Sequence, residues 1–90
     1  SLTRAQFAAI VAKSFNLPPK QPATNFSDVP SNFWAAEAIT KANRMGFITG
    51  FPDGTFRPGL NLTRTQAIVA LVNGLGLTGG TPQLLGLYSD

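Results

Sequence analysis

The sequence predicts a mainly α-helical fold built from a repeated unit. Residues 2–6 and 62–66 carry the same helix-start signature, and apolar residues follow each of them at helical spacing. A stretch rich in turn-forming residues, 47–58, lies between the helices. These observations predict a unit made of a helix, a short hairpin or loop, and a second helix. The chain is expected to be a fragment of a helical-bundle array.

The first helix is expected over residues 4–15. The Thr3 side chain can accept a hydrogen bond from the backbone of Gln6, and the Gln6 side chain can reach back to the Thr3 N–H, which makes a capping box. The apolar side chains that follow keep helical spacing: Phe7, Ile10, Val11 and Phe15. Residues 16–24 contain three prolines and are therefore expected to form a surface connection.

The second helix is expected over residues 33–45, after a short extended segment at residues 26–30. Ser31 or Asn32 can cap its start, and Gly46 is expected to end it. Its apolar stripe consists of Ala35, Ala38, Ile39, Ala42 and Met45.

A tight hairpin is expected over residues 47–57. Its turn is Pro52-Asp53-Gly54, because proline presets the turn, aspartate can hydrogen-bond back to the backbone and glycine can adopt a positive φ. Two phenylalanines flank the turn and are predicted to pack on each other, Phe51 and Phe56.

The third helix is expected over residues 64–75, where Thr63 and Gln66 make a second capping box. Residues 67–72 are apolar on nearly every side of this helix, so it is expected to be central and buried on several sides.

The chain repeats itself at a spacing of about sixty residues, which predicts a tandem array. The matching segments are Leu2-Thr3-Arg4 with Leu62-Thr63-Arg64, Gln6 with Gln66, and Phe26-Ser27-Asp28 with Tyr88-Ser89-Asp90. We expect residues 1–25 to be the C-terminal helix of a preceding repeat with its linker, and residues 26–77 to be one complete repeat. Residues 78–90 are expected to be a linker and the start of a following repeat.

The composition limits the classes of partner. The 90 residues have a net charge of +3, with 43% hydrophobic and 12% charged residues. So few charges imply that helix faces are covered by neighbouring repeats or by further copies of the chain. The basic residues are scattered, which argues against nucleic acid as a partner. The longest apolar run, residues 67–72, is too short to cross a bilayer, so no membrane insertion is expected of this segment.

Catalysis and metal binding find little support in the composition. The chain has no histidine and no cysteine. Its four acids lie one per structural segment instead of in pairs: Asp28, Glu37, Asp53 and Asp90. The loops around Asp28 and Asp53 are not dense enough in oxygen ligands to predict a calcium site. We therefore expect no enzyme activity, no metal and no cofactor.

Several segments together resemble the S-layer homology module. They are Phe26-Ser27-Asp28-Val29, Phe33-Trp34-Ala35, residues 46–58 and Leu62-Thr63-Arg64, in the order and spacing of that family. Residues 73–80 resemble its cyanobacterial branch. The resemblance implies a non-catalytic module of the cell envelope, which anchors an exported protein at the cell wall, the S-layer or the periplasmic side of the outer membrane. The implied ligand is an acidic polysaccharide linked to peptidoglycan, which is pyruvylated in the better-known members.

The resemblance also implies site residues. The family's Ile-Thr-Arg-Ala-Glu motif supplies an arginine to the binding groove, and Arg4 and Arg64 occupy that position here. Gln6 and Gln66 stand where the family usually has glutamate, which leaves the charge pattern of the ligand open.

Each candidate ligand-binding residue has a second interpretation. Arg4 and Arg64 can bind a carboxylate with the free amides of their helix starts, or lie solvated over the preceding loop. Trp34 can stack on a sugar ring or plug the core. Asp53 can accept hydrogen bonds from ligand hydroxyls or serve the turn alone, which needs Gly54 in both cases. The alternative to carbohydrate binding is a structural repeat for self-association or protein–protein contacts at the cell surface.

Overall fold

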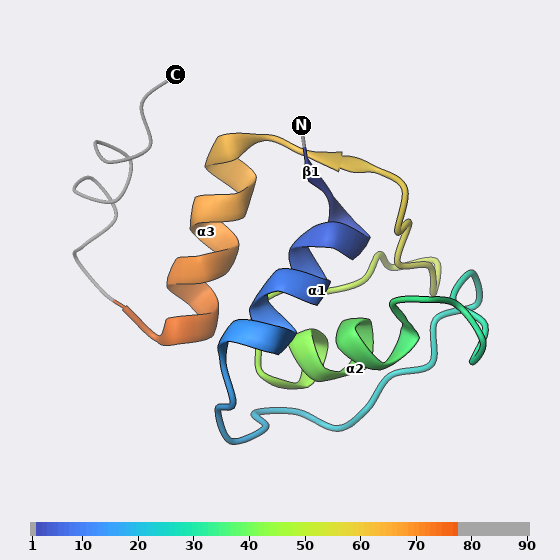
Figure 1. Cartoon of the computed structure of the whole chain (residues 1–90), viewed down its shortest axis with the longest axis horizontal. Helices are drawn as coiled ribbons and strands as arrows, with labels where there is room; N and C mark the ends of the chain where they lie inside the picture. Colours follow the sequence, from blue (N-terminus) through green and yellow to red (C-terminus); the bar gives the residue numbers. More distant parts are fainter. Residues whose placement is uncertain (1, 78–90) are drawn as a thin grey trace.

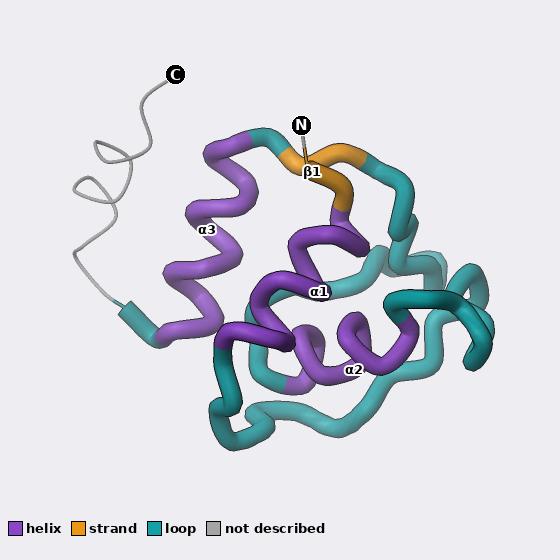
Figure 2. Tube along the Cα trace, in the orientation of Figure 1, coloured by secondary structure: helices purple, strands orange, loops and turns teal. Residues whose placement is uncertain are grey.

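The computed structural model describes residues 2–77, and its fold is mainly helical, as the sequence predicts (Figure 1). Helices and strands follow one another in the order β1 (Leu2–Thr3), α1 (Arg4–Ser14), α2 (Ala36–Arg44), β2 (Asn61–Leu62) and α3 (Arg64–Leu75). Helix α1 lies in the middle, with α2 and α3 on different sides of it, and long loops connect the helices (Figures 1 and 2).

Both predicted capping boxes are confirmed. The Gln6 N–H donates to the Thr3 hydroxyl at 3.1 Å, and the Thr3 N–H donates to the Gln6 side chain at 2.9 Å. At the second box, the Gln66 N–H donates to the Thr63 hydroxyl at 3.1 Å, and the Thr63 N–H donates to the Gln66 side chain at 2.9 Å. The two helices therefore start where these local signals predict.

The two helix-start segments also meet in space, which the sequence does not predict. β1 and β2 pair antiparallel, with Leu2 opposite Leu62 and Thr3 opposite Asn61. Leu2 thus faces Leu62, the residue that matches it in the sequence, across a short ladder, and α1 and α3 lead away from it.

The predicted start of α2 is wrong. The helix begins at Ala36, and its first flanking residue, Ala35, offers no side-chain cap, so neither Ser31 nor Asn32 has that role. The chain before the helix turns instead: the Phe33 N–H donates to the Pro30 carbonyl at 2.9 Å, and the Val29 N–H donates to the Phe26 carbonyl at 3.1 Å. Each of these hydrogen bonds joins residues three positions apart and therefore closes a turn. The expected extended segment at residues 26–30 is thus also wrong.

The central position expected for α3 is wrong as well. Val69 and Leu75 on this helix remain 43% and 37% exposed. Its buried face is made mostly of small residues: Ala67, Ile68, Ala70 and Gly74. Gly74 allows a close approach to Phe47, because a Cβ atom there would lie 2.0 Å from the Phe47 ring. One tightly packed face leaves the other face of α3 open, and α1 is the central helix.

The proline-containing connection lies on the surface, as predicted, but it is firmly attached. The Lys20 N–H donates to the Arg44 carbonyl at 2.7 Å, and the Lys20 ammonium donates to the Gly74 carbonyl at 2.9 Å. Lys20 thereby satisfies carbonyl groups at the ends of both α2 and α3.

Candidate functional site

The turn after α2 has the predicted chemistry without the predicted strands. The Phe51 N–H donates to the Thr55 carbonyl at 2.8 Å, and the Gly54 N–H donates to the Phe51 carbonyl at 3.0 Å. Asp53 accepts hydrogen bonds from the Thr55 N–H and hydroxyl, and Gly54 has φ +86°. No strand forms over residues 47–57, so the turn is tight but the two-stranded hairpin is wrong.

Asp28 fixes the outgoing arm of this turn from a distant part of the chain. Its two carboxylate oxygens accept the N–H groups of Phe56 and Arg57, both at 2.8 Å. Arg57 has φ +58°, a conformation that costs roughly 1 kcal/mol or more in a residue other than glycine. Desolvation raises the pKa of Asp28, but the backbone hydrogen bonds outweigh it and leave the pKa below its ordinary value.

Arg4 enters the same turn from the start of α1. Only 8% of its surface is exposed. Its Nε donates to the Phe56 carbonyl at 2.7 Å and its Nη2 to the Thr49 carbonyl at 2.5 Å. The guanidinium carbon lies 4.7 and 4.6 Å from the ring centres of Phe51 and Phe56, within cation–π range. This arginine therefore holds the turn together and is not the solvated side chain of the second interpretation.

The positive charge of Arg4 has no carboxylate partner within residues 2–77: its hydrogen bonds go to carbonyl groups, and it makes no ion pair there. Burial lowers the pKa of Arg4, the nearby Arg57 lowers it further, and Asp28 partly opposes both effects. The arginine stays charged at neutral pH, so a net positive field remains at this site.

Arg57 is a site residue that sequence reasoning missed. Its guanidinium lies 3.9 Å from the Phe51 ring centre and 3.1 Å from the Asp53 carboxylate. Nothing in the local sequence distinguishes it, because its conformation depends on Asp28, a residue 29 positions away. The predicted packing of Phe51 on Phe56 is wrong. The Phe56 ring packs on the Phe26 ring, with 5.1 Å between their centres, and the Phe51 ring contacts the guanidinium groups of Arg4 and Arg57.

A groove of about 420 Å³ lies beside this cluster, between α3 and the loops before and after the turn. Its lining combines a cation, an aromatic ring and polar side chains: Arg4, Phe51, Thr49, Asn61, Gln66 and Asn73. Hydroxyl and amide groups can hydrogen-bond to sugar hydroxyls, and an aromatic face can pack on a sugar ring. The groove thus combines groups suited to an acidic carbohydrate.

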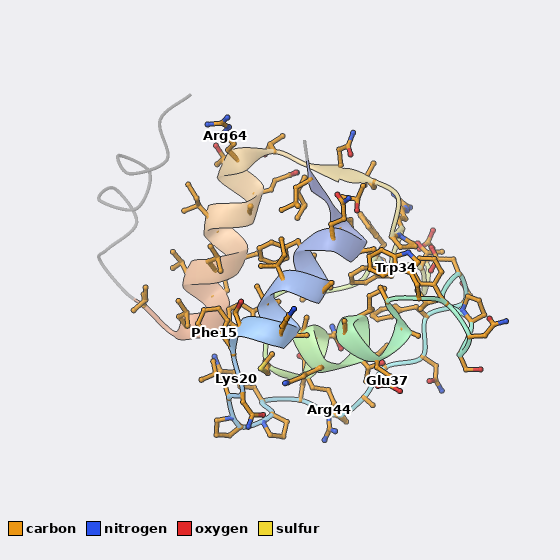
Figure 3. The ribbon with its side chains drawn as sticks, viewed as in Figure 1. Phe15, Lys20, Trp34, Glu37, Arg44 and Arg64 are labelled. Atoms are coloured by element: carbon orange, nitrogen blue, oxygen red, sulfur yellow. The ribbon has the colours of Figure 1, made fainter. Side chains whose placement is uncertain are left out.

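The five predicted site residues do not form one site. Arg4, Asp53 and Gly54 come together around the turn. Arg64 lies at the start of α3 and Trp34 on the opposite side of the molecule (Figure 3). Trp34 is 67% exposed and contacts Phe33 at 5.8 Å, so its interpretation as a core plug is wrong.

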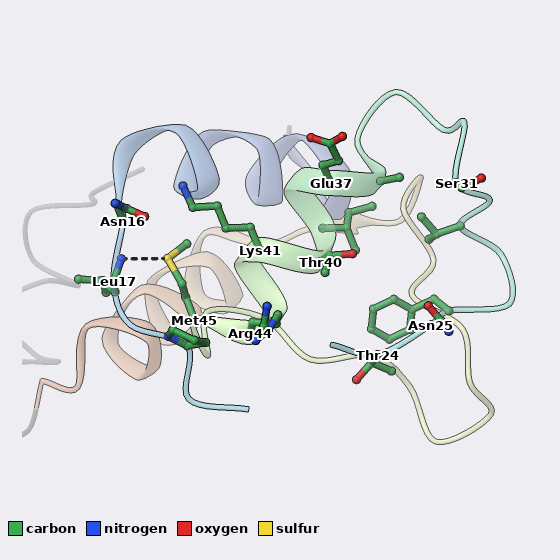
Figure 4. A pocket seen from close by; sticks show the side chains of 15 residues that line it. Asn16, Leu17, Thr24, Asn25, Ser31, Glu37, Thr40, Lys41, Arg44 and Met45 are labelled. Carbon is green, nitrogen blue, oxygen red and sulfur yellow. Dashed lines mark hydrogen bonds between the residues drawn. The ribbon is translucent and has the colours of Figure 1, made fainter. Parts of the chain in front are cut away.

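A second, larger cleft of about 690 Å³ lies between α2 and the connection that precedes it (Figure 4). Glu37, Thr40, Lys41 and Arg44 line it from α2. Two of these side chains are already engaged: Lys41 donates to the Ala12 carbonyl at 2.9 Å and Arg44 to the Gln21 carbonyl at 3.4 Å. The sequence does not predict this cleft.

The described residues contain neither a cluster of metal ligands nor a helix that could span a membrane. No group of three His, Cys, Asp or Glu side chains there could hold a metal ion. None of the helices in that part of the chain is long and apolar enough to cross a membrane.

Comparison with known families decides the assignment, because residues 25–68 match the S-layer homology domain. These residues form an S-layer homology domain. Outer membrane protein SlpA of Thermus thermophilus is 54% identical over 46 residues, which cover 51% of this chain and 5% of that protein. Cell surface glycoprotein 1 of Acetivibrio thermocellus is 41% identical over 69 residues, covering 73% of this chain and 3% of that protein.

The cellulosome-anchoring protein of Acetivibrio thermocellus is 36% identical over 70 residues, covering 73% of this chain and 16% of that protein. The chain thus spans a small part of these relatives. No solved structure matches it. The resemblance to the S-layer homology module is confirmed, and it places the chain in the cell envelope. The likeness to the cyanobacterial branch stays a prediction.

Proposed function

We propose that the chain is a non-catalytic anchoring module that binds an acidic polysaccharide of the cell wall in the groove beside Arg4. The relatives support anchoring, since their names include a cellulosome-anchoring protein and a middle cell wall protein. The ligand is proposed to be linked to peptidoglycan and to carry carboxylates, such as those of pyruvate ketals.

The buried charge of Arg4 is the observation that carries this proposal. A cation that is 8% exposed and lacks an ion pair within the described residues attracts an anion more strongly than a solvated one, because little water screens it. Arg57 adds a second cation at the Phe51 ring, although Asp53 offsets part of its charge. A carboxylate that binds in the groove is attracted by these two positive charges. Its binding does not require a further positive charge to be buried.

The uncharged lining supports a sugar over a simple anion. The side chain of Asn61 is exposed at the groove, where its amide can both donate and accept hydrogen bonds. Phe51 is half-buried and offers part of its ring surface to the groove. A single weak site becomes firm attachment when several modules act together. Of the other predicted residues, Asp53 and Gly54 are proposed to shape this site, while Arg64 and Trp34 would contact ligand only outside this groove.

The proposal is tested by binding of the chain to purified cell-wall sacculi. Asn61→Ala removes one groove amide without touching the hydrogen bonds of the turn, so the protein should fold normally. Loss of a hydrogen bond to a ligand should weaken retention about 5- to 10-fold. Asn32→Ala, an exposed asparagine away from the groove, is the matched control and should bind like the wild type.

Raising the salt concentration should also weaken retention, because salt screens the attraction between the arginines and a carboxylate. Retention that is insensitive to both Asn61→Ala and salt would contradict the proposed groove.

A further inference from the structure

The cleft between α2 and the connection that precedes it has no part in the proposed function. Its volume of about 690 Å³ is typical of a site for a small ligand. Buried apolar side chains line its floor: Phe26, Ile39 and Met45 are at most 9% exposed. The cleft can therefore shield the apolar part of a ligand from water.

The rim of this cleft carries polar side chains that are available to a ligand. Four of them make no side-chain hydrogen bond within residues 2–77: Thr24, Asn25, Ser31 and Thr40. Their hydroxyl and amide groups can both donate and accept hydrogen bonds. The rim can thus pair with the amide groups of a ligand whose apolar part lies on the floor.

Two cations lie together at one end of the cleft. Lys41 and Arg44 are three positions apart on α2, so their side chains lie on the same face (Figure 4). The Lys41 ammonium is fixed by its hydrogen bond to the Ala12 carbonyl, and the Arg44 Nε makes one long hydrogen bond to the Gln21 carbonyl. Both cations keep further N–H donors, and neither makes an ion pair within the described residues. A ligand carboxylate at this end is attracted by both positive charges.

Glu37 gives the other end of the cleft the opposite charge. Its carboxylate is exposed and makes no hydrogen bond or ion pair in the part of the chain that the structure describes. Glu37 precedes Arg44 by seven positions, which is about 10 Å along the helix axis. An extended peptide covers at most about 3.5 Å per residue, so roughly three residues span this distance. The ammonium group and the carboxylate of such a peptide match the two ends of the cleft.

We propose that this cleft binds a short peptide with free termini. Its carboxylate lies at Lys41 and Arg44, its ammonium group lies at Glu37, and an apolar side chain packs on the floor. An acidic sugar has the carboxylate but no ammonium group, so Glu37 favours the peptide. The proposal does not rest on polysaccharide binding, because the cleft and the groove beside Arg4 share no lining residue.

The test is an NMR titration of the chain with the tripeptide alanyl-leucyl-alanine. Signals of α2 and of residues 24–31 should shift, and the peptide should bind with a dissociation constant in the millimolar range. Acetylating its amine or amidating its carboxylate should each weaken binding about 3- to 5-fold, the effect of losing one exposed ion pair.

Variants of the charged residues assign the two ends. Arg44→Gln should weaken binding about 3- to 5-fold, and Arg44→Lys should keep most of it because the charge remains. Lys13→Gln is the matched control, since it removes an exposed cation that does not line the cleft, and it should leave binding unchanged. Glu37→Gln should abolish the preference for the free amine over the acetylated one.

Three results would overturn the inference: no shift at the cleft residues, equal effects of Arg44→Gln and Lys13→Gln, or a preference for the free amine that survives Glu37→Gln. Glucuronate that binds as tightly as the peptide would also contradict it. None of these results would change the retention on sacculi expected of the wild type and of Asn61→Ala, so this inference and the proposed function fail separately.

Discussion

At the scale of single residues, the site depends on a guanidinium buried among carbonyl groups. Arg4 donates to two backbone carbonyls from different arms of the turn, which a lysine cannot do with the same geometry. Its two aromatic neighbours, Phe51 and Phe56, add cation–π attraction. The arginine motif that the family resemblance assigns to ligand binding is thus also a structural element of the turn.

Arg4→Lys should lower the free energy of unfolding by about 2 kcal/mol, because one charged hydrogen bond and the planar stacking are lost. Chemical denaturation checks this value. Arg44→Lys is the matched control: Arg44 is exposed and makes one long hydrogen bond at 3.4 Å, so its replacement should stay within about 0.5 kcal/mol. Equal effects of the two changes would show that burial of Arg4 does not matter to stability.

Asp28 should make the fold sensitive to acid. Its pKa is lowered in the folded state by the backbone hydrogen bonds, despite desolvation, so the stability it supplies is complete above the unfolded pKa of about 3.9. That stability is lost as pH falls through the lower folded pKa. Asp53 acts in the same direction, through the hydroxyl and amide of Thr55.

Thermal unfolding between pH 2 and pH 6 measures this contribution. Asp28→Asn should lower the melting temperature at pH 6 and flatten its decline below pH 4, because the amide does not titrate. A decline as steep as that of the wild type would contradict the assigned role of Asp28.

At the scale of elements, α3 is held through one narrow face. Gly74→Ala places a Cβ atom 2.0 Å from the Phe47 ring, which forces the helix or the ring to move. Alanine gains about 1 kcal/mol of helix propensity, but overpacking costs about 1–3 kcal/mol, and an overlap this short lies at the upper end of that range.

We expect a net loss of about 1–2 kcal/mol for Gly74→Ala. Denaturant titration provides the measurement. Gly59→Ala is the control, because nothing lies within 4 Å of a Cβ atom there, and it should be nearly neutral. A Gly74→Ala protein that is more stable than the wild type would contradict the close packing of α3 on Phe47.

Local signals explain what the sequence predicts correctly. The capping boxes at Thr3 and Thr63 each need only three further residues, so both helix starts follow from the sequence. The pairing of β1 with β2 joins residues about sixty apart and has no local signal. The apolar composition of α3 predicts burial on several sides, whereas Val69 and Leu75 are exposed, because only one face of this helix packs on the rest of the described chain.

In the candidate site, too, the features that depend on local sequence are predicted and those that depend on tertiary contacts are not. The turn at Asp53 and Gly54 follows from residue chemistry, and the motif points to Arg4. The motif does not predict that Arg4 reaches into a turn about fifty residues away. The sequence also does not predict that Arg57 adopts a positive φ, or that Arg64 and Trp34 lie far apart. Those facts arise from tertiary contacts, such as the hydrogen bonds of Asp28 to the backbone of Phe56 and Arg57.

At the scale of the whole molecule, the chain contains one S-layer homology domain over residues 25–68 and a preceding helix that completes its turn. The groove is built from that helix, from the turn and from α3. The helix that precedes the matched domain therefore contributes to the proposed binding site together with the domain itself.

The most direct test is retention of the chain on two preparations of sacculi, one native and one stripped of its acidic secondary polysaccharide. We expect strong retention on native sacculi and loss of most binding on the stripped ones, with Asn61→Ala weakening only the native interaction. Equal retention on both preparations would contradict an acidic polysaccharide as the ligand.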